Sequence, residues 1–544
     1  MATYYASGSG SDSNNGTSPN TPWRNAPGMP QASGSAAITL SAGDIVYLMD
    51  GTWTTYGNGA GWDINASGTQ SSPIIISAYD GCNPILDNRS DLSSAAWTYV
   101  GSGIWTTPLT ATSLQALWVD GQSFKPSGGA TPSYGEAGLV SNVLYVGFGL
   151  SRGSTIFAVT NGGSAAPGYC VRIRDRSYVH LRGLTTRGGN YAGIILQMGS
   201  AAAVLTGCKI IDCDVGYQTS GISLSGINTN PTGGIKSTEI KSCYVHSDIT
   251  TSGDYTSSEG RGDGIAAVNA IDGLLIENCV VRDFRHSQLE VNTTSSPTGT
   301  FMQGIRMLWN DVSAPARLYG RGIGVAGSGV SGIAIVGNRI HDHPTRNQVG
   351  SIGGVFCGNI VERVTGTVVY GGVRGEGLML QTWDTGKNQS YVSGLFVCNN
   401  VFADTKNAAI ALLTSNSVNM GANTIANNIT IRPSTYDCSV TESSGSIATQ
   451  TIVNNCFTGD SIYDRGSAKS VSTANSGSEY ENNITSDPLL DSSYRPKAGS
   501  PVIGAGTYIP GAKHMGGQPM NASAPDIGAY RYHPAPGTFL FRAH

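Results

Sequence analysis

A short hydrophobic pattern recurs along most of this chain and limits its fold more than any other feature. Each copy reads aliphatic, any residue, aliphatic, polar, then Asn or Cys, then further aliphatic residues. Most copies stand 27 to 36 residues apart, with one shorter and one longer interval beside Asn359. A repeat of this length indicates a solenoid in which each interval is one structural unit. The copies are centred on Cys208, Cys243, Cys279, Asn310, Asn338, Asn359, Asn400, Asn428, Asn455 and Asn483.

The pattern predicts short β-strands. Alternating aliphatic residues fill the inside of a strand with a period of two, and stacked coils bury them in one continuous core. An Asn between two strands can bond the backbone at a bend and can stack on the Asn of the next coil. A second strand, commonly introduced by Gly, precedes many copies, as at Ile194, Ile222, Ile265, Ile323 and Leu378. We therefore predict an all-β, single-stranded parallel β-helix of about ten coils between residues 170 and 486. A β-propeller is the second alternative, but its blades need antiparallel hairpins at a steadier period.

Composition and charge exclude several classes of partner. Charged residues make up 12% of the chain, about half the usual share of about 25%. The formal net charge is −4 and there is no long basic run, so nucleic-acid binding is not expected. No apolar stretch approaches the roughly 18 residues of a membrane-spanning helix, so we expect no membrane insertion. The ten cysteines include no CxxC pair, and those inside the repeats are interpreted as small buried hydrophobic residues.

Both ends of the chain carry a family resemblance. The opening YYASGSGSDSNNGTSPNTPW, with AGDIVYLMDGTW and SPIIISAYDGCNPILD after it, resembles the first coils of pectate-lyase-like right-handed β-helix proteins. The segment SDPLLDSSYRPKAGSPVIGAG, followed by APDIGAY, is similar to the closing module of many bacterial and phage β-helix proteins. The predicted parts are an N-terminal start of the β-helix at 1–89, a β-rich insertion at 90–166, the main β-helix at 167–486, and a C-terminal closing module and tail at 487–544.

Two recurrent polar features are interpreted as structural. Aspartates follow the bend residue by four positions in several coils, which favours turn residues that accept backbone N–H bonds. These are Asp212, Asp283, Asp342 and Asp404. His341 and His343 stand two residues apart without a third ligand beside them, so they are interpreted as loop residues, and no metal site is predicted.

The candidate site lies on the outer face of the Gly-led strands. With Ile265, Leu289 and Ile323 facing inward, alternation points Glu290 outward between Ala266 and Gly324 of the flanking coils. Such small neighbours leave room for a sugar beside the carboxylate. The candidate catalytic residues are Asp263, Glu290, Glu259, Arg321 and His286, and the candidate substrate-binding residues are Arg261, Gln288, Tyr319, Arg374, Glu376 and Trp383.

Two chemistries fit these residues, and a third alternative involves no chemistry. In glycoside hydrolysis, one of Asp263, Glu259 or Glu290 is the acid and another the base or nucleophile. In uronate lyase chemistry, Arg or His abstracts a proton and a cation or Arg neutralises the sugar carboxylate; the candidates are Arg261, Arg285, Arg321 and His286. Ca²⁺ enters only under this lyase alternative, which would need several carboxyl ligands for the ion. The third alternative is a solvated surface that binds polysaccharide without cleaving it.

The resemblance implies a particular biological role. Phage tailspike proteins and polysaccharide depolymerases share this architecture, so it implies a protein that binds and depolymerises a bacterial capsule, exopolysaccharide or O-antigen. Hydrolysis is favoured over elimination because the sequence shows neither the Asp-rich calcium cluster typical of pectate lyases nor the Lys/Arg motif of alginate lyases. It further implies a homotrimer, attachment to a phage tail or baseplate protein, and a virion-tail or extracellular location. The alternatives are a non-catalytic receptor-binding spike and a secreted bacterial polysaccharide lyase.

Overall fold

The computed structural model describes residues 1–532 with internal gaps. The gaps are residues 55–60, 112, 162–167, 190, 217–219, 228–232, 248–261, 294–300, 316–319, 328, 370–371, 385–388 and 516. The described chain divides into two compact units, residues 1–302 with 312–324, and residues 303–311 with 325–544. Within the described residues, no helix is long and apolar enough to cross a membrane.

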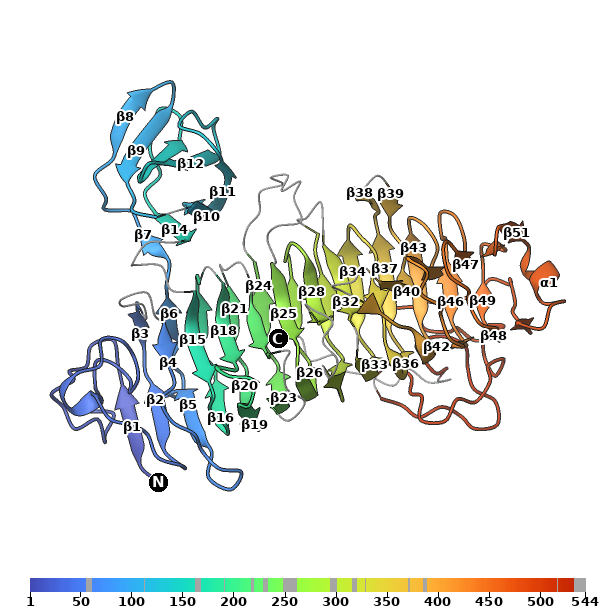
Figure 1. The fold of residues 1–544 in the computed structure, drawn as a ribbon, viewed down its shortest axis with the longest axis horizontal. Helices are drawn as coiled ribbons and strands as arrows, with labels where there is room; N and C mark the ends of the chain where they lie inside the picture. The colour runs from blue at the N-terminus through green and yellow to red at the C-terminus, as the bar shows by residue number, and fades with distance from the viewer. Residues whose placement is uncertain are drawn as a thin grey trace. The chain divides into compact units, whose positions relative to one another are not determined.

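Parallel strands of the first unit form three sheets, and successive strands of one sheet belong to successive coils (Figure 1). The first sheet contains β1 (Thr3–Ala6), β2 (Ile45–Leu48), β5 (Ile74–Ala78), β16 (Val179–Arg182), β19 (Val204–Thr206), β20 (Lys209–Ile211), β23 (Gly234–Lys241) and β26 (Ile271–Glu277). The second contains β4 (Trp62–Asp63), β15 (Tyr169–Arg174), β18 (Ala192–Gln197), β22 (Ile222–Ser225), β25 (Asp263–Val268) and β28 (Ser287–Asn292). The third contains β3 (Gly51–Trp53), β6 (Pro84–Asp87), β17 (Thr185–Arg187), β21 (Asp214–Gly216), β24 (Tyr244–His246) and β27 (Val280–Arg282). Residues of both units occur in β29 (Met302–Gln303), β31 (Asp311–Ser313) and β32 (Arg321–Ala326).

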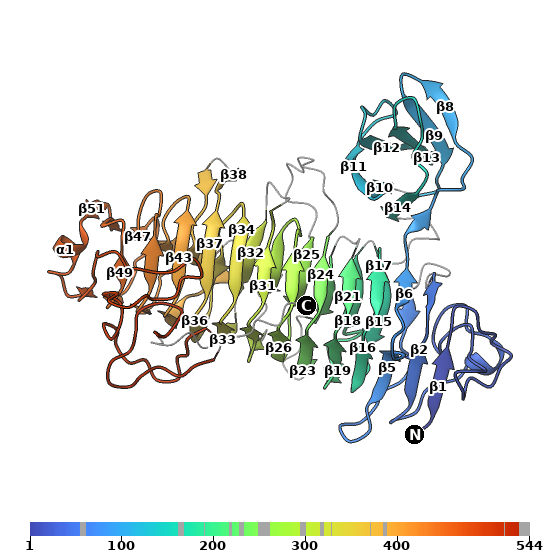
Figure 2. The same ribbon diagram turned by 180° about the vertical axis from the view of Figure 1, so that it is seen from behind.

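The second unit repeats this arrangement, as the reverse view also shows (Figure 2). Its first sheet contains β30 (Arg306–Leu308), β33 (Val330–Val336), β36 (Ile352–Cys357), β42 (Ser393–Cys398), β45 (Thr424–Ala426), β48 (Thr451–Val453) and β52 (Tyr480–Glu481). Its second contains β35 (Gln348–Val349), β40 (Leu378–Asp384), β41 (Gln389–Ser390), β44 (Ile410–Thr414), β47 (Cys438–Glu442), β50 (Ile462–Asp464) and β51 (Ser467–Lys469). Its third contains β34 (Arg339–His343), β37 (Ile360–Val364), β43 (Val401–Thr405), β46 (Ile429–Ile431) and β49 (Cys456–Phe457). A separate hairpin joins β38 (Thr367–Val369) and β39 (Gly372–Arg374).

The predicted fold class is confirmed: the chain is an all-β, right-handed parallel β-helix. Ile194, Ile222, Ile265 and Leu289 are paired from coil to coil in register, and all four are fully buried. Apolar side chains from one coil therefore pack on identical or similar side chains of the next, which makes one continuous core. The described helices are short, namely the 3-10 helix η1 (Gly34–Ala36) and α1 (Val471–Ala474).

Residues 90–161 fold differently from the coils. They form an 8-stranded, mostly antiparallel sheet with its own apolar core, which includes Leu117, Leu144 and Ile156. Its strands are β7 (Ser90–Asp91), β8 (Thr98–Gly101), β9 (Ile104–Pro108), β10 (Ser113–Val119), β11 (Gln122–Ser127), β12 (Glu136–Val140), β13 (Val143–Gly147) and β14 (Ile156–Asn161).

A column of buried asparagines runs through the bends of the second unit. Asn338 Oδ1 accepts hydrogen bonds from the backbone N–H and from Nδ2 of Asn310, both at 2.9 Å. Asn338 Nδ2 also donates to the Met307 carbonyl. Each asparagine therefore satisfies backbone groups at a bend where no strand partner can reach them. The same contacts continue through Asn359, Asn400, Asn428, Asn455 and Asn483.

The column ends at the C-terminal side of the second unit. Asn475, directly after α1, places its Oδ1 2.9 Å from Nδ2 of Asn483 and 3.3 Å from its backbone N. Beyond this point the chain turns back along the third sheet, where Val502, Met515 and Ile527 pack on Ile360 and Val401. The closing segment thus covers an apolar outer face of the coils.

The structure corrects two details of the sequence interpretation and supports a third only in part. The bend residue between β20 and β21 is Cys213, in line with Cys243 and Cys279, whereas Cys208 lies one strand earlier. His341 and His343 are strand residues of β34 and not loop residues; His341 bonds Asp311 and Asp342. All four recurrent aspartates have positive φ. Asp212 and Asp283 lie outside the strands, as expected for turn residues, whereas Asp342 and Asp404 lie within β34 and β43. Two of them, Asp342 and Asp404, bond arginine side chains.

We expect Asn428→Ala to destabilise the protein strongly. The substitution leaves the buried Asn400 N–H, the Asn400 amide and the Val397 carbonyl each short of a partner. Each unsatisfied group costs about 1–3 kcal/mol, so the free energy of unfolding should fall by about 3 kcal/mol or more in denaturant titrations. The control is Asn419→Ala in an exposed loop, where we expect a loss of about 0.5 kcal/mol. Equal losses in the two variants would contradict this account of the column.

Candidate active site

The candidate site is formed by neighbouring strands of the second sheet in the first unit. Asp263 begins β25, Glu290 lies in β28, and Arg321 begins β32, the next strand of that sheet. His286 directly precedes β28, and its backbone N–H bonds the Gly262 carbonyl of the coil before. Parallel pairing sets Asp263 opposite Ser287 and Ala266 opposite Glu290. Residues that are far apart in the sequence are therefore held one coil apart, about 4.8 Å along the stack.

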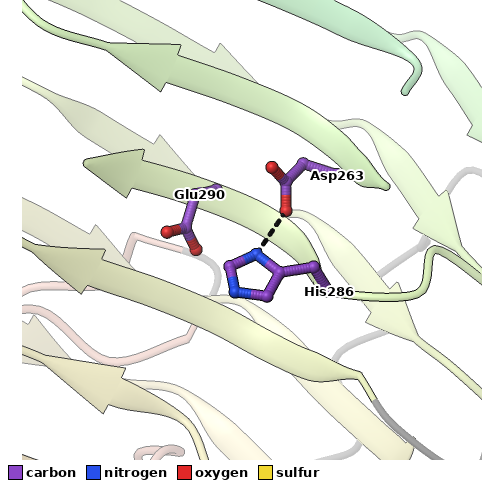
Figure 3. Close-up of side chains that lie close together, drawn as sticks. All are labelled: Asp263, His286 and Glu290. Atoms are coloured by element: carbon purple, nitrogen blue, oxygen red, sulfur yellow. Dashed lines mark hydrogen bonds and ion pairs between the residues drawn. The ribbon is translucent and has the colours of Figure 1, made fainter. Parts of the chain in front are cut away.

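Asp263 and His286 form a hydrogen-bonded pair (Figure 3). Asp263 Oδ1 lies 2.8 Å from His286 Nδ1 and also accepts the backbone N–H of Ser287 at 3.1 Å. On the other side of the imidazole, Arg321 Nη2 lies 2.9 Å from His286 Nε2. Because an arginine can only donate, Nε2 accepts this bond, and Nδ1 carries the proton that is shared with Asp263. The aspartate thus fixes the tautomer and the orientation of the ring.

Glu290 is almost completely buried, at 2% exposure, and is held by two neighbours in its own strand. Ser287 Oγ donates to Oε2 at 2.7 Å, and Asn292 Nδ2 donates to Oε1 at 3.3 Å. The Glu290 carboxylate fills the space beside Gly324, where a Cβ would lie 2.1 Å from Oε2. The flanking residues are small, as expected from the sequence, but Glu290 and Ala266 are buried, and the room for a sugar beside the carboxylate is not open.

Burial and neighbouring charges shift the pKa values of two groups of the site. Burial raises the pKa of Glu290 above its ordinary value; Asp263 acts in the same direction, while His286 and Arg321 oppose it. Burial and the Arg321 cation lower the pKa of His286, but the Asp263 and Glu290 carboxylates outweigh them and raise it above 6.5. The site therefore holds a carboxyl group that stays protonated further toward neutral pH than an exposed glutamate. This property suits a general acid.

A metal ion bound at this site would have to displace the Arg321 guanidinium. Ligand atoms of Asp263, His286 and Glu290 lie within 4.8 Å of one another, a set that could hold an ion. However, the Arg321 guanidinium bonds Nε2, and Nδ1 bonds Asp263, so both ring nitrogens of His286 are already in use. The local charge is balanced by arginine, and the arrangement fits acid–base chemistry better than metal binding.

The other residues proposed from the sequence are not all near this cluster. Gln288 is fully buried, and its amide bonds the backbone N and O of Phe284, so it supports the His286 segment and does not contact a ligand. Glu376 belongs to the second unit, where it bonds Asn407 and Gly375. The half-buried Trp383 in β40 and Arg374 in β39 also belong to that unit. Glu259, Arg261 and Tyr319 lie outside the described residues.

Two supporting residues were missed by the sequence analysis. Ser287 bridges both acids, since its N–H bonds Asp263 and its hydroxyl bonds Glu290. Asn292 follows Glu290 by two positions, and this spacing puts both side chains on the same outer face of β28. That period-two relation was the available signal for Asn292, whereas the role of Ser287 depends on the pairing register.

A column of outward residues extends from Glu290 across the neighbouring coils. Register places Ala266, Ser223, Ile195 and Arg172 in line with it, one coil after another. Ala266 and Ser223 are small, and Arg172 is held by Asp63 through a bidentate ion pair. Ala266, Ser223 and Ile195 are buried, so this column is covered and only its Arg172 end is partly exposed.

Comparison with known proteins identifies no family for the chain. No family model and no curated protein matches its sequence. Among solved structures, one described as XylC in complex with xylose has 10% identity and a TM-score of 0.47, covering 90% of this chain and 87% of its own. A glycoside hydrolase has 11% identity and a TM-score of 0.45, covering 91% and 100%. Pectate lyase Pel9A has 14% identity and a TM-score of 0.40, covering 98% and 97%. Because all three TM-scores are below 0.5, the activities in these descriptions belong to those proteins alone.

We expect the pKa of His286 to depend on its contact with Asp263. In the wild-type chain, its pKa should exceed 6.5 when it is followed by the NMR shifts of the imidazole protons. Asp263→Asn removes one of the two carboxylates that raise this pKa and leaves burial and Arg321, which lower it. The pKa of His286 should therefore fall in that variant. An unchanged value would contradict the assigned contact, and Asp212→Asn at an exposed turn serves as the control.

Proposed function

We propose that this protein cleaves a polysaccharide by glycoside hydrolysis at Asp263 and Glu290. The observation that carries the proposal is the pair of carboxyls on adjacent coils, whose ligand atoms lie within 4.8 Å of each other. Retaining glycosidases hold their two carboxyl groups about 5–5.5 Å apart, whereas inverting enzymes need about 6.5–9.5 Å to admit a water. The spacing supports a retaining mechanism.

The two carboxyls differ in a way that assigns their roles. Glu290, with its raised pKa, is the acid that protonates the leaving glycosidic oxygen. Asp263, which accepts hydrogen bonds from His286 and Ser287, is the carboxylate that attacks the anomeric carbon. Glu290 then takes a proton from the water that releases the sugar from Asp263. His286 and Arg321 are the half-exposed members of the group, so an approaching sugar meets them first.

Elimination from a uronate is the second candidate, and it rests on His286. An imidazole held by an aspartate, with an Nε2 that carries no proton, has the arrangement of a general base. Arg321, beside that nitrogen, would turn to the carboxylate of the sugar and leave Nε2 free to abstract a proton. The half-exposure of both side chains favours this alternative, because they reach a substrate more easily than the buried carboxyls.

The biological setting remains the one proposed from the sequence. We propose a phage tailspike-like protein that acts on a bacterial capsule, exopolysaccharide or O-antigen, as a homotrimer attached to a phage tail or baseplate protein. The location would then be a virion tail or the extracellular space. The resemblance of the segment SDPLLDSSYRPKAGSPVIGAG and the following APDIGAY to the closing module of many bacterial and phage β-helix proteins supports this setting. A non-catalytic receptor-binding spike and a secreted bacterial lyase are the alternatives.

We expect Asp263→Asn and Glu290→Gln each to lower the rate of depolymerisation at least about a hundred-fold, the usual size of an acid–base contribution. Release of reducing ends from purified bacterial capsule and O-antigen preparations measures this rate. Asp212→Asn exchanges the same groups at an exposed turn of the same unit and should retain wild-type activity. Full activity in both site variants would show that Asp263 and Glu290 are not the catalytic carboxyls.

The products should distinguish the three alternatives. Hydrolysis releases reducing ends without an unsaturated sugar, and proton NMR should show that the first product keeps the anomeric configuration of the substrate. Ultraviolet absorbance of an unsaturated uronate would establish elimination at His286. Retention of the polymer by the protein without either product would establish the binding spike.

A further inference from the structure

Two cysteines of the second unit face each other across adjacent coils. Cys357 ends β36 and Cys398 ends β42, and the two residues are direct partners in the parallel register. Directly paired parallel residues are separated by about 4.8 Å, which lies within the 4.4–6.8 Å range of Cα separations in disulfides. Their side chains leave the sheet on the same side, and the two Sγ atoms are in contact at 2.7 Å.

Stacked cysteines also occur in the first unit. Cys213, Cys243 and Cys279 follow one another along the coils, and their thiols bond backbone carbonyls. Cys243 also contacts the thiols of both Cys213 and Cys279, so neither neighbour is its single partner. Cys398 directs its thiol at the sulfur of Cys357. The geometry of the Cys357–Cys398 pair is therefore the one that a covalent bond needs.

We propose that Cys357 and Cys398 are joined by a disulfide when the chain folds under oxidising conditions. With oxidised glutathione as the oxidant, one cysteine thiolate attacks the glutathione disulfide and releases one reduced glutathione. The second cysteine then attacks the mixed disulfide and releases another. Two cysteine thiols are oxidised, one glutathione disulfide is reduced to two thiols, and one S–S bond forms between neighbouring coils.

The surroundings of the pair determine when this reaction takes place. Ile509, Ala512 and Met520 of the closing segment cover both cysteines, and Cys357 Sγ contacts the Lys513 carbonyl. Both residues are almost fully buried, at 1% and 0% exposure. The Cys357 contact and burial raise the pKa of Cys398 well above its ordinary value, which suppresses the reactive thiolate. The bond therefore forms before the closing segment docks, and afterwards the same cover protects it from reductants.

The cross-link closes a long segment of the chain. Its ends are 41 residues apart, and the closed loop contains β37 to β41. A bond of this kind restricts the unfolded chain more than the folded one, so it stabilises the native state. It would keep the coil that carries Glu376 and Trp383 anchored at both ends.

Peptide mapping of the full-length protein tests the bond directly. The protein is refolded with and without oxidised glutathione, treated with iodoacetamide in denaturant, and digested with trypsin. Cleavage after Arg346, Arg363, Lys387 and Lys406 yields residues 347–363 and 388–406, each with a single cysteine. We expect these two peptides to appear as one linked species that lacks two hydrogen atoms, while Cys170, whose thiol bonds backbone carbonyls, is recovered as an alkylated thiol.

A variant keeps the test independent of folding yield. The unfolding temperature of the oxidised wild-type protein should exceed that of the reduced protein, and Cys398→Ala should show no such dependence on reductant. In protein refolded with oxidised glutathione, recovery of Cys357 and Cys398 as alkylated thiols to the same extent as Cys170 would overturn the proposal. Linkage of either cysteine to a different partner would overturn it as well.

Discussion

The coils are held together by hydrogen bonds between each backbone segment and the segments one turn before and after it. Within strands these bonds form the parallel ladders of the three sheets. At the bends, buried N–H groups and carbonyls have no strand partner, and in the second unit the asparagine column supplies one. A buried polar group without a partner costs more than most single contacts contribute. The regular stacking therefore depends on a side chain that can both donate and accept at the same bend in every coil.

The same stacking determines what the candidate site can do. A fixed rise of about 4.8 Å per coil brings Asp263 and Glu290 close together although they are distant in sequence. Side chains on an outer face of the sheet are held by a rigid backbone, so their separation does not depend on loops. Ser287, Asn292 and Gly324 then fix the Glu290 carboxylate, through two hydrogen bonds and the space left by a missing side chain.

The sequence predicted the architecture more reliably than the details of the site. Period-two alternation was sufficient to assign Ile265 and Leu289 to the core and Glu290 to the outer face. It failed at Gln288, whose outward position does not expose it, because its amide turns back to the Phe284 backbone. The pattern also aligned Cys208 with the bends, whereas an extra short strand, β19, makes Cys213 the bend residue. Hydrogen bonds between side chains and pairing register depend on contacts between coils, which one coil's sequence does not encode.

The asparagine column also determines where the solenoid stops. A stack in which each member bonds the next leaves its last member with unused donors and acceptors, and a further copy of the repeat could continue the series. Asn475 occupies that place with a side chain from a short helical turn, which presents no strand edge to a following coil. The last asparagine of the column is thus satisfied by a helical turn and not by another coil. The chain supplies its own end to the hydrogen-bonded stack at this bend.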